Sequence, residues 1–257
     1  MRVLFVKQDH ISPDGFVGDA FTSLGYDVSE LIVVPEEHHE APNVTVTFPD
    51  PRHYDAVVAF GAVWSVYDQK AIGNWIGDEI AFTREAIANG VPVLGICFGG
   101  QMLAAALGGE VSRAPEPEIG WHVVESADQN LVDPGPWFQW HYDRFELPAT
   151  MRILASTRKA DQAFVQGRSL GLQFLPELTP AVLETWLGAG GAEQLAANGV
   201  DADELMTRTK ELQAAAGPRT HELIRRFVRD VATAAVDATI LTPHVTLTPR
   251  LRNHYCR

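Results

Sequence analysis

The stretch Val91-Pro-Val-Leu-Gly-Ile-Cys-Phe-Gly-Gly-Gln101 predicts a strand that turns directly into a helix, with Cys97 at the turn. Gly95 and Gly99 lie two residues on either side of the cysteine, the G-x-nucleophile-x-G spacing of a nucleophile elbow. Larger side chains at the two flanking positions would collide in so tight a turn. The strained central residue projects from the carboxyl edge of the sheet, where ligands bind in open α/β folds. The segment therefore predicts an α/β fold with Cys97 in a ligand site.

The flanking segments continue the alternation of strands and helices. Buried strands are expected at residues 2–6, 28–34, 54–60 and 91–96, and helices at 16–24, 75–88 and 101–107. This alternation predicts a mainly parallel central sheet flanked by helices. Between residues 111 and 174 the runs are shorter, and segments 163–166 and 170–174 predict a small antiparallel hairpin. Further helices are expected at 180–187, 202–215 and 218–235, with Gly217-Pro218 separating the last two.

Composition excludes several classes of function. The chain has 257 residues, and its 20 basic against 33 acidic side chains give a net charge of −13, which argues against non-specific nucleic-acid binding. No apolar run approaches the roughly 18–20 residues of a membrane span, so no membrane partner is expected. The two cysteines, Cys97 and Cys256, exclude a disulfide framework and indicate a reducing cytoplasm. Residues 1–235 are expected to form one domain, and residues 236–257 a C-terminal tail.

The predicted position of Cys97 suits a nucleophile. The N-terminus of the following helix carries partial positive charge and favours thiolate over thiol, so the sequence predicts a lowered thiol pKa and faster alkylation than at Cys256. The backbone N–H of Phe98 is placed to stabilise an oxyanion. The alternative is a buried structural cysteine, because cysteine behaves as a small hydrophobe. Neither a phosphate-binding glycine motif nor zinc-ligand spacing occurs, so no cofactor and no metal are expected.

Five segments resemble, in the same order along the chain, motifs of the class I (triad-type) glutamine amidotransferases, and most closely the stand-alone relatives of the GMP synthase amidotransferase domain. The resemblance covers roughly residues 1–235 and implies a flavodoxin-like fold. The segments are the oxyanion loop Gly61–Asp68, the nucleophile motif Gly95–Gln101, Glu118–Trp121, Trp140–Asp143, and the final hairpin and catalytic loop, Gln162–Phe164 with Gly171–Glu177.

The resemblance implies roles for particular residues. Cys97 would form a thioester with the side-chain carbonyl of glutamine or a related amide, and the N–H groups of Gly61 and Phe98 would hold the oxyanion. The substrate-binding residues implied are Gln101, Trp140 and His141. No synthase domain is recognisable in the sequence, so a working amidotransferase of this kind would need its ammonia-accepting synthase partner in trans.

One departure from the family pattern bears on catalysis. The family's catalytic loop reads Gln-Phe-His-Pro-Glu, with the histidine as general base, whereas this chain has Leu175 at the histidine position and Glu177 at the glutamate position. Leucine neither accepts nor donates a proton. His141 is the best candidate for a substitute base, although the histidine of that motif is not the general base of the family.

Whether the chain is an active enzyme is therefore left open by the sequence. One hypothesis is glutamine hydrolysis through Cys97, impaired or altered by the loss of the base. A second is a catalytically weak or inactive member of the family that binds a ligand or a partner. A third is a cysteine hydrolase of the wider superfamily.

Overall fold

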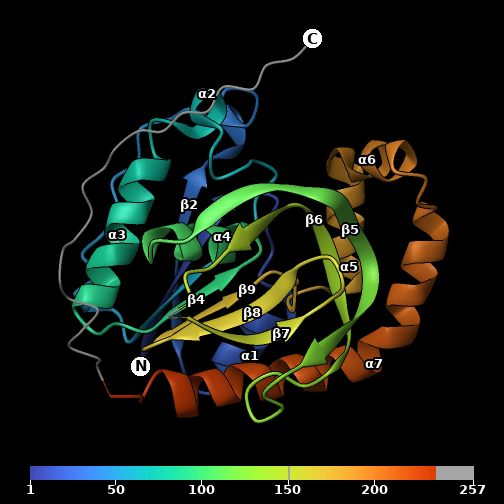
Figure 1. Ribbon diagram of the computed structural model, residues 1–257. Helices are drawn as coiled ribbons and strands as arrows, with labels where there is room; N and C mark the ends of the chain where they lie inside the picture. The colour runs from blue at the N-terminus through green and yellow to red at the C-terminus, as the bar shows by residue number, and fades with distance from the viewer. Residues whose placement is uncertain (150, 236–257) are drawn as a thin grey trace.

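The computed structural model describes residues 1–149 and 151–235, so the predicted tail and Cys256 lie outside the described residues (Figure 1). The strands are β1 (Arg2–Asp9), β2 (Asp27–Val34), β3 (Ala56–Ala59), β4 (Val93–Ile96), β5 (Glu110–Ser126), β6 (Gly135–Glu146), β7 (Arg152–Ser156), β8 (Asp161–Gln166) and β9 (Ser169–Leu172). The α-helices are α1 (Gly15–Ser23), α2 (Gln69–Ile72), α3 (Ile76–Ala88), α4 (Phe98–Ala106), α5 (Pro180–Trp186), α6 (Ala192–Ala197) and α7 (Ala202–Arg226).

The strands form one mixed sheet in the order β2-β1-β3-β4-β9-β8-β7-β5-β6. Neighbouring strands from β2 to β9 pair in parallel, and the pairs beyond β9 are antiparallel. The carboxyl ends of the five parallel strands therefore share one edge, where Cys97 follows β4. This arrangement confirms the predicted α/β class with its mainly parallel centre.

Both faces of the parallel part of the sheet are buried, as βαβ connections require. Along β1, Val3 and Phe5 pack in the cluster under α1 and α7, whereas Leu4 and Val6 pack in the opposite cluster with α3 and α4. Figure 1 shows the sheet between these two helical layers. No helix of the described segments is long and apolar enough to cross a membrane.

The antiparallel part of the sheet is larger than the predicted hairpin. Strands β5 and β6 pair along most of their length, and β5 also meets β7 through Glu125 and Ser126. Prolines 115 and 117 lie where the β5–β6 register shifts, between Arg113 and Glu118, and Gly120 has a left-handed φ of 100°. These irregularities hide the strand pattern, because a bulge interrupts the regular alternation of side chains.

The predicted helix break at Gly217-Pro218 is wrong, because α7 continues through Pro218. A proline inside a helix removes one backbone hydrogen bond, so tertiary contacts must compensate for it. Arg219 donates to the carbonyl of Pro136 at 2.7 Å, and Thr220 donates to the carbonyl of Pro176 at 2.7 Å. These bonds join α7 to β6 and to the loop that follows β9.

Candidate active site

Cys97 occupies a strained turn between β4 and α4. Its φ of 53° and ψ of −108° make it the only residue other than glycine with a left-handed φ among those described. A Cβ at Gly95 would lie 2.4 Å from the carbonyl oxygen of Gly99, and a Cβ at Gly99 would lie 2.1 Å from that of Ala59. The backbone segments are therefore too close for any side chain at these positions, as predicted for a nucleophile elbow.

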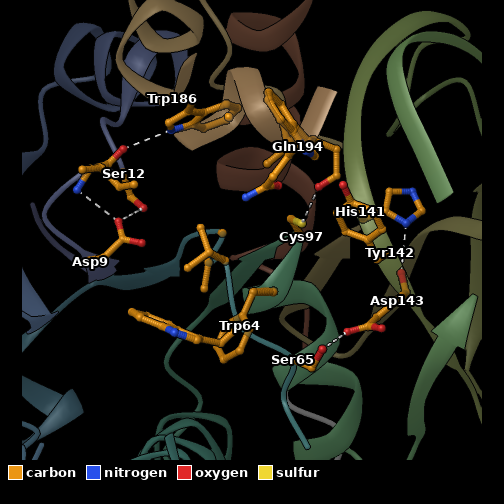
Figure 2. A pocket seen from close by; sticks show the side chains of 18 of the residues that line it. Asp9, Ser12, Trp64, Ser65, Cys97, His141, Tyr142, Asp143, Trp186 and Gln194 are labelled. Carbon is orange, nitrogen blue, oxygen red and sulfur yellow. Dashed lines mark hydrogen bonds between the residues drawn. The ribbon is translucent and has the colours of Figure 1, made fainter. Parts of the chain in front are cut away.

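A single cavity of about 150 Å³ collects all eight residues predicted for the site (Figure 2). Backbone and side chains reach it from the ends of β3, β4 and β9, from the start of α4 and from β6. The predicted residues that line it are Gly61, Cys97, Phe98, Gln101, Trp140, His141, Leu175 and Glu177.

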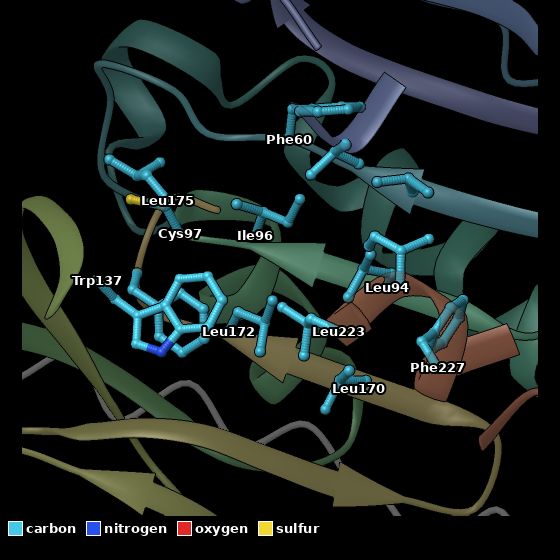
Figure 3. Close-up of a cluster of buried hydrophobic side chains, with 14 of the residues drawn as sticks. Phe60, Leu94, Ile96, Cys97, Trp137, Leu170, Leu172, Leu175, Leu223 and Phe227 are labelled. Atoms are coloured by element: carbon cyan, nitrogen blue, oxygen red, sulfur yellow. The ribbon is translucent and has the colours of Figure 1, made fainter. Parts of the chain in front are cut away.

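Leu175 lies beside Cys97 and is buried, with 4% of its surface exposed. A Cβ built on Gly61 would lie 3.5 Å from Leu175 Cδ2 and 3.7 Å from Cys97 Cβ, so all three residues meet at one point. Figure 3 shows the leucine and the cysteine together at the end of the apolar cluster that lies under the sheet. The position next to the thiol is thus occupied by an apolar side chain that cannot transfer protons.

Glu177 is a buried carboxyl group without a partner for one of its oxygens. Its Oε2 is buried and makes no hydrogen bond to the described protein, and only 2% of the residue is exposed. Burial raises the pKa of Glu177 to about 8, although its own backbone N–H lowers it slightly. At neutral pH this side chain is therefore mainly a neutral acid.

The predicted lowering of the Cys97 pKa is wrong. Burial raises the pKa of the Cys97 thiol to about 12, and the nearby carboxyl groups of Glu177 and Asp143 raise it further. The Phe98 N–H and the Gln173 side chain oppose the shift but do not overcome it. The sequence reveals the helix N-terminus, which lowers a thiol pKa, but it does not reveal how completely the thiol is buried. Here the effect of desolvation on the pKa is larger than the effect of the helix N-terminus.

His141 is held by other residues rather than by the thiol. Its Nδ1 lies 2.9 Å from the carbonyl oxygen of Asp143, and its Nε2 lies 3.4 Å from Glu118 Oε2. Figure 2 shows the ring turned toward Asp143 and away from Cys97. Burial alone would raise the pKa of Glu118, but His141, Thr157 and His122 together outweigh it and lower the pKa. Both ring nitrogens of His141 therefore face oxygen atoms of other residues, and His141 makes no hydrogen bond to the thiol of Cys97.

Asp143 fixes the loop that carries Gly61. Its carboxylate accepts hydrogen bonds from the hydroxyl groups of Ser65 and, at 2.8 Å, Tyr67. These two bonds join the loop after β3 to β6 and hold the loop over Cys97. Both hydroxyl groups belong to the Ser-Val-Tyr-Asp segment that the sequence matched to the oxyanion loop, yet Asp143 was not predicted as their partner.

The structure adds further residues that the sequence analysis did not single out. Gln173 donates from Nε2 to Cys97 Sγ at 3.8 Å, and its Oε1 accepts from Gln101 Nε2 at 3.3 Å. Asp9, Trp64 and Trp186 form the outer part of the cavity. Gln173 and Trp64 lie within the segments that the sequence analysis matched to the family, whereas Asp9 and Trp186 carried no sequence signal. Within residues 1–149 and 151–235, no three His, Cys, Asp or Glu side chains converge as a metal site requires.

Comparison with known protein families shows which family this chain belongs to. The profile described as glutamine amidotransferase class-I matches residues 21–187, which is more than half of the chain. The protein therefore belongs to the class-I glutamine amidotransferases, as the sequence motifs predicted.

The curated relatives include GMP synthases. The glutamine-hydrolyzing GMP synthase of Aeropyrum pernix is 37% identical over 135 residues, which are 48% of this chain and 26% of that protein. In Sulfolobus acidocaldarius, the relative is one subunit of a glutamine-hydrolyzing GMP synthase. It is 33% identical over 137 residues, which are 49% of this chain and 69% of that relative. The matched region thus spans about a quarter of the first relative's length, and the predicted likeness to GMP synthases is confirmed.

Solved structures show the same fold. A glutamine amidotransferase from Thermotoga maritima aligns with a TM-score of 0.77 at 27% identity, covering 90% of this chain and 99% of that one. A glutamine amido transferase from Methylobacillus flagellatus aligns with a TM-score of 0.76 at 23% identity, over 90% of this chain and 95% of that one. These alignments confirm the predicted flavodoxin-like arrangement.

Proposed function

We propose that the protein binds the side-chain amide of glutamine, or of a related amide, in the Cys97 cavity and hydrolyses it slowly through a Cys97 thioester. The observation that carries this proposal is the meeting of a strained nucleophile elbow, the Gly61 loop and the catalytic loop at one cavity. Membership of the class-I amidotransferase family supports it.

The proposed reaction has two steps. Sγ of Cys97 attacks the amide carbon, the carbon–nitrogen bond breaks, and the thiol proton leaves with the nitrogen as ammonia. The N–H groups of Gly61 and Phe98 stabilise the oxyanion. Water then hydrolyses the thioester, releasing glutamate and restoring the thiol. Each step requires a proton transfer beside Sγ.

Slow turnover follows from the groups that surround the thiol. Leu175 cannot carry a proton, and the ring nitrogens of His141 face Asp143 and Glu118. The raised pKa of Cys97 leaves little thiolate at neutral pH. Loss of a positioned acid–base group typically lowers a rate by about 10²–10⁴-fold.

A second candidate function is ligand binding without turnover. The apolar Leu175 and the neutral Glu177 favour it, because together they leave the thiol without a base. In this function the cavity would hold a glutamine-like amide as a signal or as a structural ligand. The third hypothesis, a cysteine hydrolase that uses a free thiolate, receives no support from a thiol whose pKa is raised to about 12.

A synthase partner is part of the proposal. The Sulfolobus acidocaldarius relative is named as one chain of a multi-chain GMP synthase, and this supports an ammonia-consuming partner on a separate chain.

Calorimetric titration with glutamine, together with a measurement of ammonia release, tests the proposed function. We expect saturable binding, and turnover well below about 1 s⁻¹, the lower end of ordinary enzyme rates. Cys97→Ala should abolish the release of ammonia and retain binding. Absence of glutamine binding to the folded protein would contradict the proposal, and ammonia release that persists in Cys97→Ala would contradict the role of the thiol.

A further inference from the structure

The cavity extends well past the nucleophile, to a wall that the proposed reaction does not use. Figure 2 shows Asp9 and Ser12 on one side of the cavity and Cys97 and Gln194 on the other, with Trp186 above and Trp64 below in this view. All six residues line the same cavity. This outer part combines a carboxyl group with two aromatic rings.

Asp9 is a buried residue of this wall, held in place by the fold, and not a surface carboxylate. It is the last residue of β1, at the carboxyl edge of the sheet, and only 1% of it is exposed. Its Oδ1 accepts hydrogen bonds from the Ile11 N–H at 3.1 Å and from the Ser12 hydroxyl at 2.6 Å. Figure 2 shows the second carboxyl oxygen directed into the cavity.

No cationic side chain of the described segments forms an ion pair with Asp9. Lys7, two residues earlier on β1, bonds instead to Asp14 at 3.1 Å and Glu30 at 2.5 Å. His10 and His39 lie near enough to oppose the effect of burial on Asp9, but burial prevails and raises its pKa. A buried carboxyl group of this kind gains from a positively charged partner, because the partner offsets its desolvation.

The aromatic rings of the outer wall are held in place. Trp186 donates from its indole nitrogen to the carbonyl of Ile11 at 3.0 Å, and its ring meets that of Trp140 edge to face at 6.2 Å between centroids. Trp64 packs against Trp75, with 6.0 Å between centroids. Aromatic faces beside a carboxylate are a common setting for an ammonium group, which both attract.

We propose that the outer part of the cavity, formed by Asp9, Trp64 and Trp186, binds a primary ammonium group of the ligand whose amide lies at Cys97. The inference rests on the proposed function, since it requires an amide in the inner part. Two ligands carry such a group: glutamine itself, through its α-ammonium, and a γ-glutamyl amide whose nitrogen bears an aminoalkyl chain.

Two pairs of ligands, each titrated by calorimetry into the wild-type chain, test this proposal. Glutamine is compared with glutaramic acid, which lacks only the α-ammonium. The γ-glutamyl amide of 1,4-diaminobutane is compared with γ-glutamyl butylamide, which replaces the terminal ammonium by a hydrogen atom. In one of the two pairs, the ligand with the ammonium group should bind at least tenfold more tightly than the ligand without it. A preference in the first pair would identify the α-ammonium of glutamine as the bound group, and a preference in the second pair would identify the terminal ammonium of the aminoalkyl chain.

The Asp9→Asn variant should reduce the ratio of the two affinities within that pair to about twofold or less, because the negative charge is lost. The amide oxygen of Asn can still accept hydrogen bonds from Ile11 and Ser12, so the loop should keep its structure. Asp27→Asn is the matched control. Asp27 is exposed at the first residue of β2, the opposite edge of the sheet, so this variant loses the same charge and should keep the ratio. Trp64→Leu gives a second test should Asp9→Asn fail to fold, and it should lower the ratio several-fold.

Equal affinities within both pairs would overturn the proposal, as would a ratio that survives both Asp9→Asn and Trp64→Leu in folded protein. Binding of the uncharged members without any preference for the ammonium would overturn this inference alone. Failure of all four ligands to bind would overturn the proposed function and this inference with it.

Discussion

At the scale of single residues, the site is governed by how completely its ionisable groups are buried. Cys97 and Glu177 lie in the same cavity, and each is shifted toward its neutral form. In an active triad a histidine between the two would become charged and would relieve both shifts. Leu175 carries no charge, so Cys97 and Glu177, the residues that match the family's catalytic cysteine and glutamate, both stay in their neutral forms at neutral pH.

The reactivity of Cys97 provides a first test of this picture. With a pKa near 12 instead of the usual value of about 8.5, the thiol should alkylate at least about 100-fold more slowly in the native protein at pH 7.5 than in urea. Iodoacetamide labelling followed by peptide mapping measures both rates. Native labelling as fast as that of the unfolded chain would show that the thiol is open and ionised.

Glu177 provides a second test, through the dependence of stability on pH. Its pKa is raised from 4.5 to about 8 on folding, so the native state holds a proton that the unfolded state releases between these values. Glu177 therefore lowers the free energy of unfolding progressively as the pH rises from about 5 to 8, by at most about 5 kcal/mol in total.

In Glu177→Gln this loss should be absent, because the amide does not ionise. Urea unfolding at pH 5, 6, 7 and 8 should show the stability of the variant rising relative to wild type across the series. A constant difference between the two proteins would mean that Glu177 has an ordinary pKa in the folded state.

At the scale of elements, close backbone contacts hold α4 against the sheet. A Cβ at Gly100 would lie 2.2 Å from the carbonyl oxygen of Leu172, the last residue of β9. The glycines around Cys97 therefore set how near the helix comes to β9 as well as the shape of the turn. The sequence motif predicted the close backbone contacts at Gly95 and Gly99, but it made no prediction for Gly100.

Gly100→Ala should destabilise the protein by about 2 kcal/mol or more, because α4 must move away from β9 to make room. Gly77→Ala is the matched control, since Gly77 is exposed on α3 and a Cβ there meets nothing within 4 Å. The control should gain about 0.5 kcal/mol from helix propensity. Equal effects of the two substitutions in thermal unfolding would contradict the close packing.

Two elements show why prediction from the sequence was incomplete. Pro218 is normally a strong signal for the end of a helix, yet bonds from Arg219 and Thr220 to other elements keep α7 continuous. Strand β5 contains two prolines where its register with β6 shifts, and Gly120 beyond them has a left-handed φ, so its alternation of side chains is broken. Both features depend on partners distant in the chain, which local patterns do not contain.

At the scale of the whole molecule, the sequence predicted the parallel half of the sheet and the gathering of eight residues at one cavity. The alternation of strands and helices was sufficient for the first, and the strand-to-helix turn at Cys97 with the family motifs was sufficient for the second. The outer wall of the cavity was not predicted. Asp9 and Trp186 are far apart in the chain, and only the packing of α5 against the loop after β1 brings them together.

The substitution Leu175→His tests the central claim, that the fold and cavity of a glutamine amidotransferase are intact and only the proton carrier is missing. Ammonia release from glutamine should be measured for wild type, Leu175→His and Leu175→His/Cys97→Ala, each confirmed to be folded. We predict at least a tenfold gain in Leu175→His that the added Cys97→Ala abolishes, a modest part of the roughly 10²–10⁴-fold that an acid–base group contributes. A folded Leu175→His protein without such a gain, or a wild-type rate already near about 1 s⁻¹, would contradict the claim.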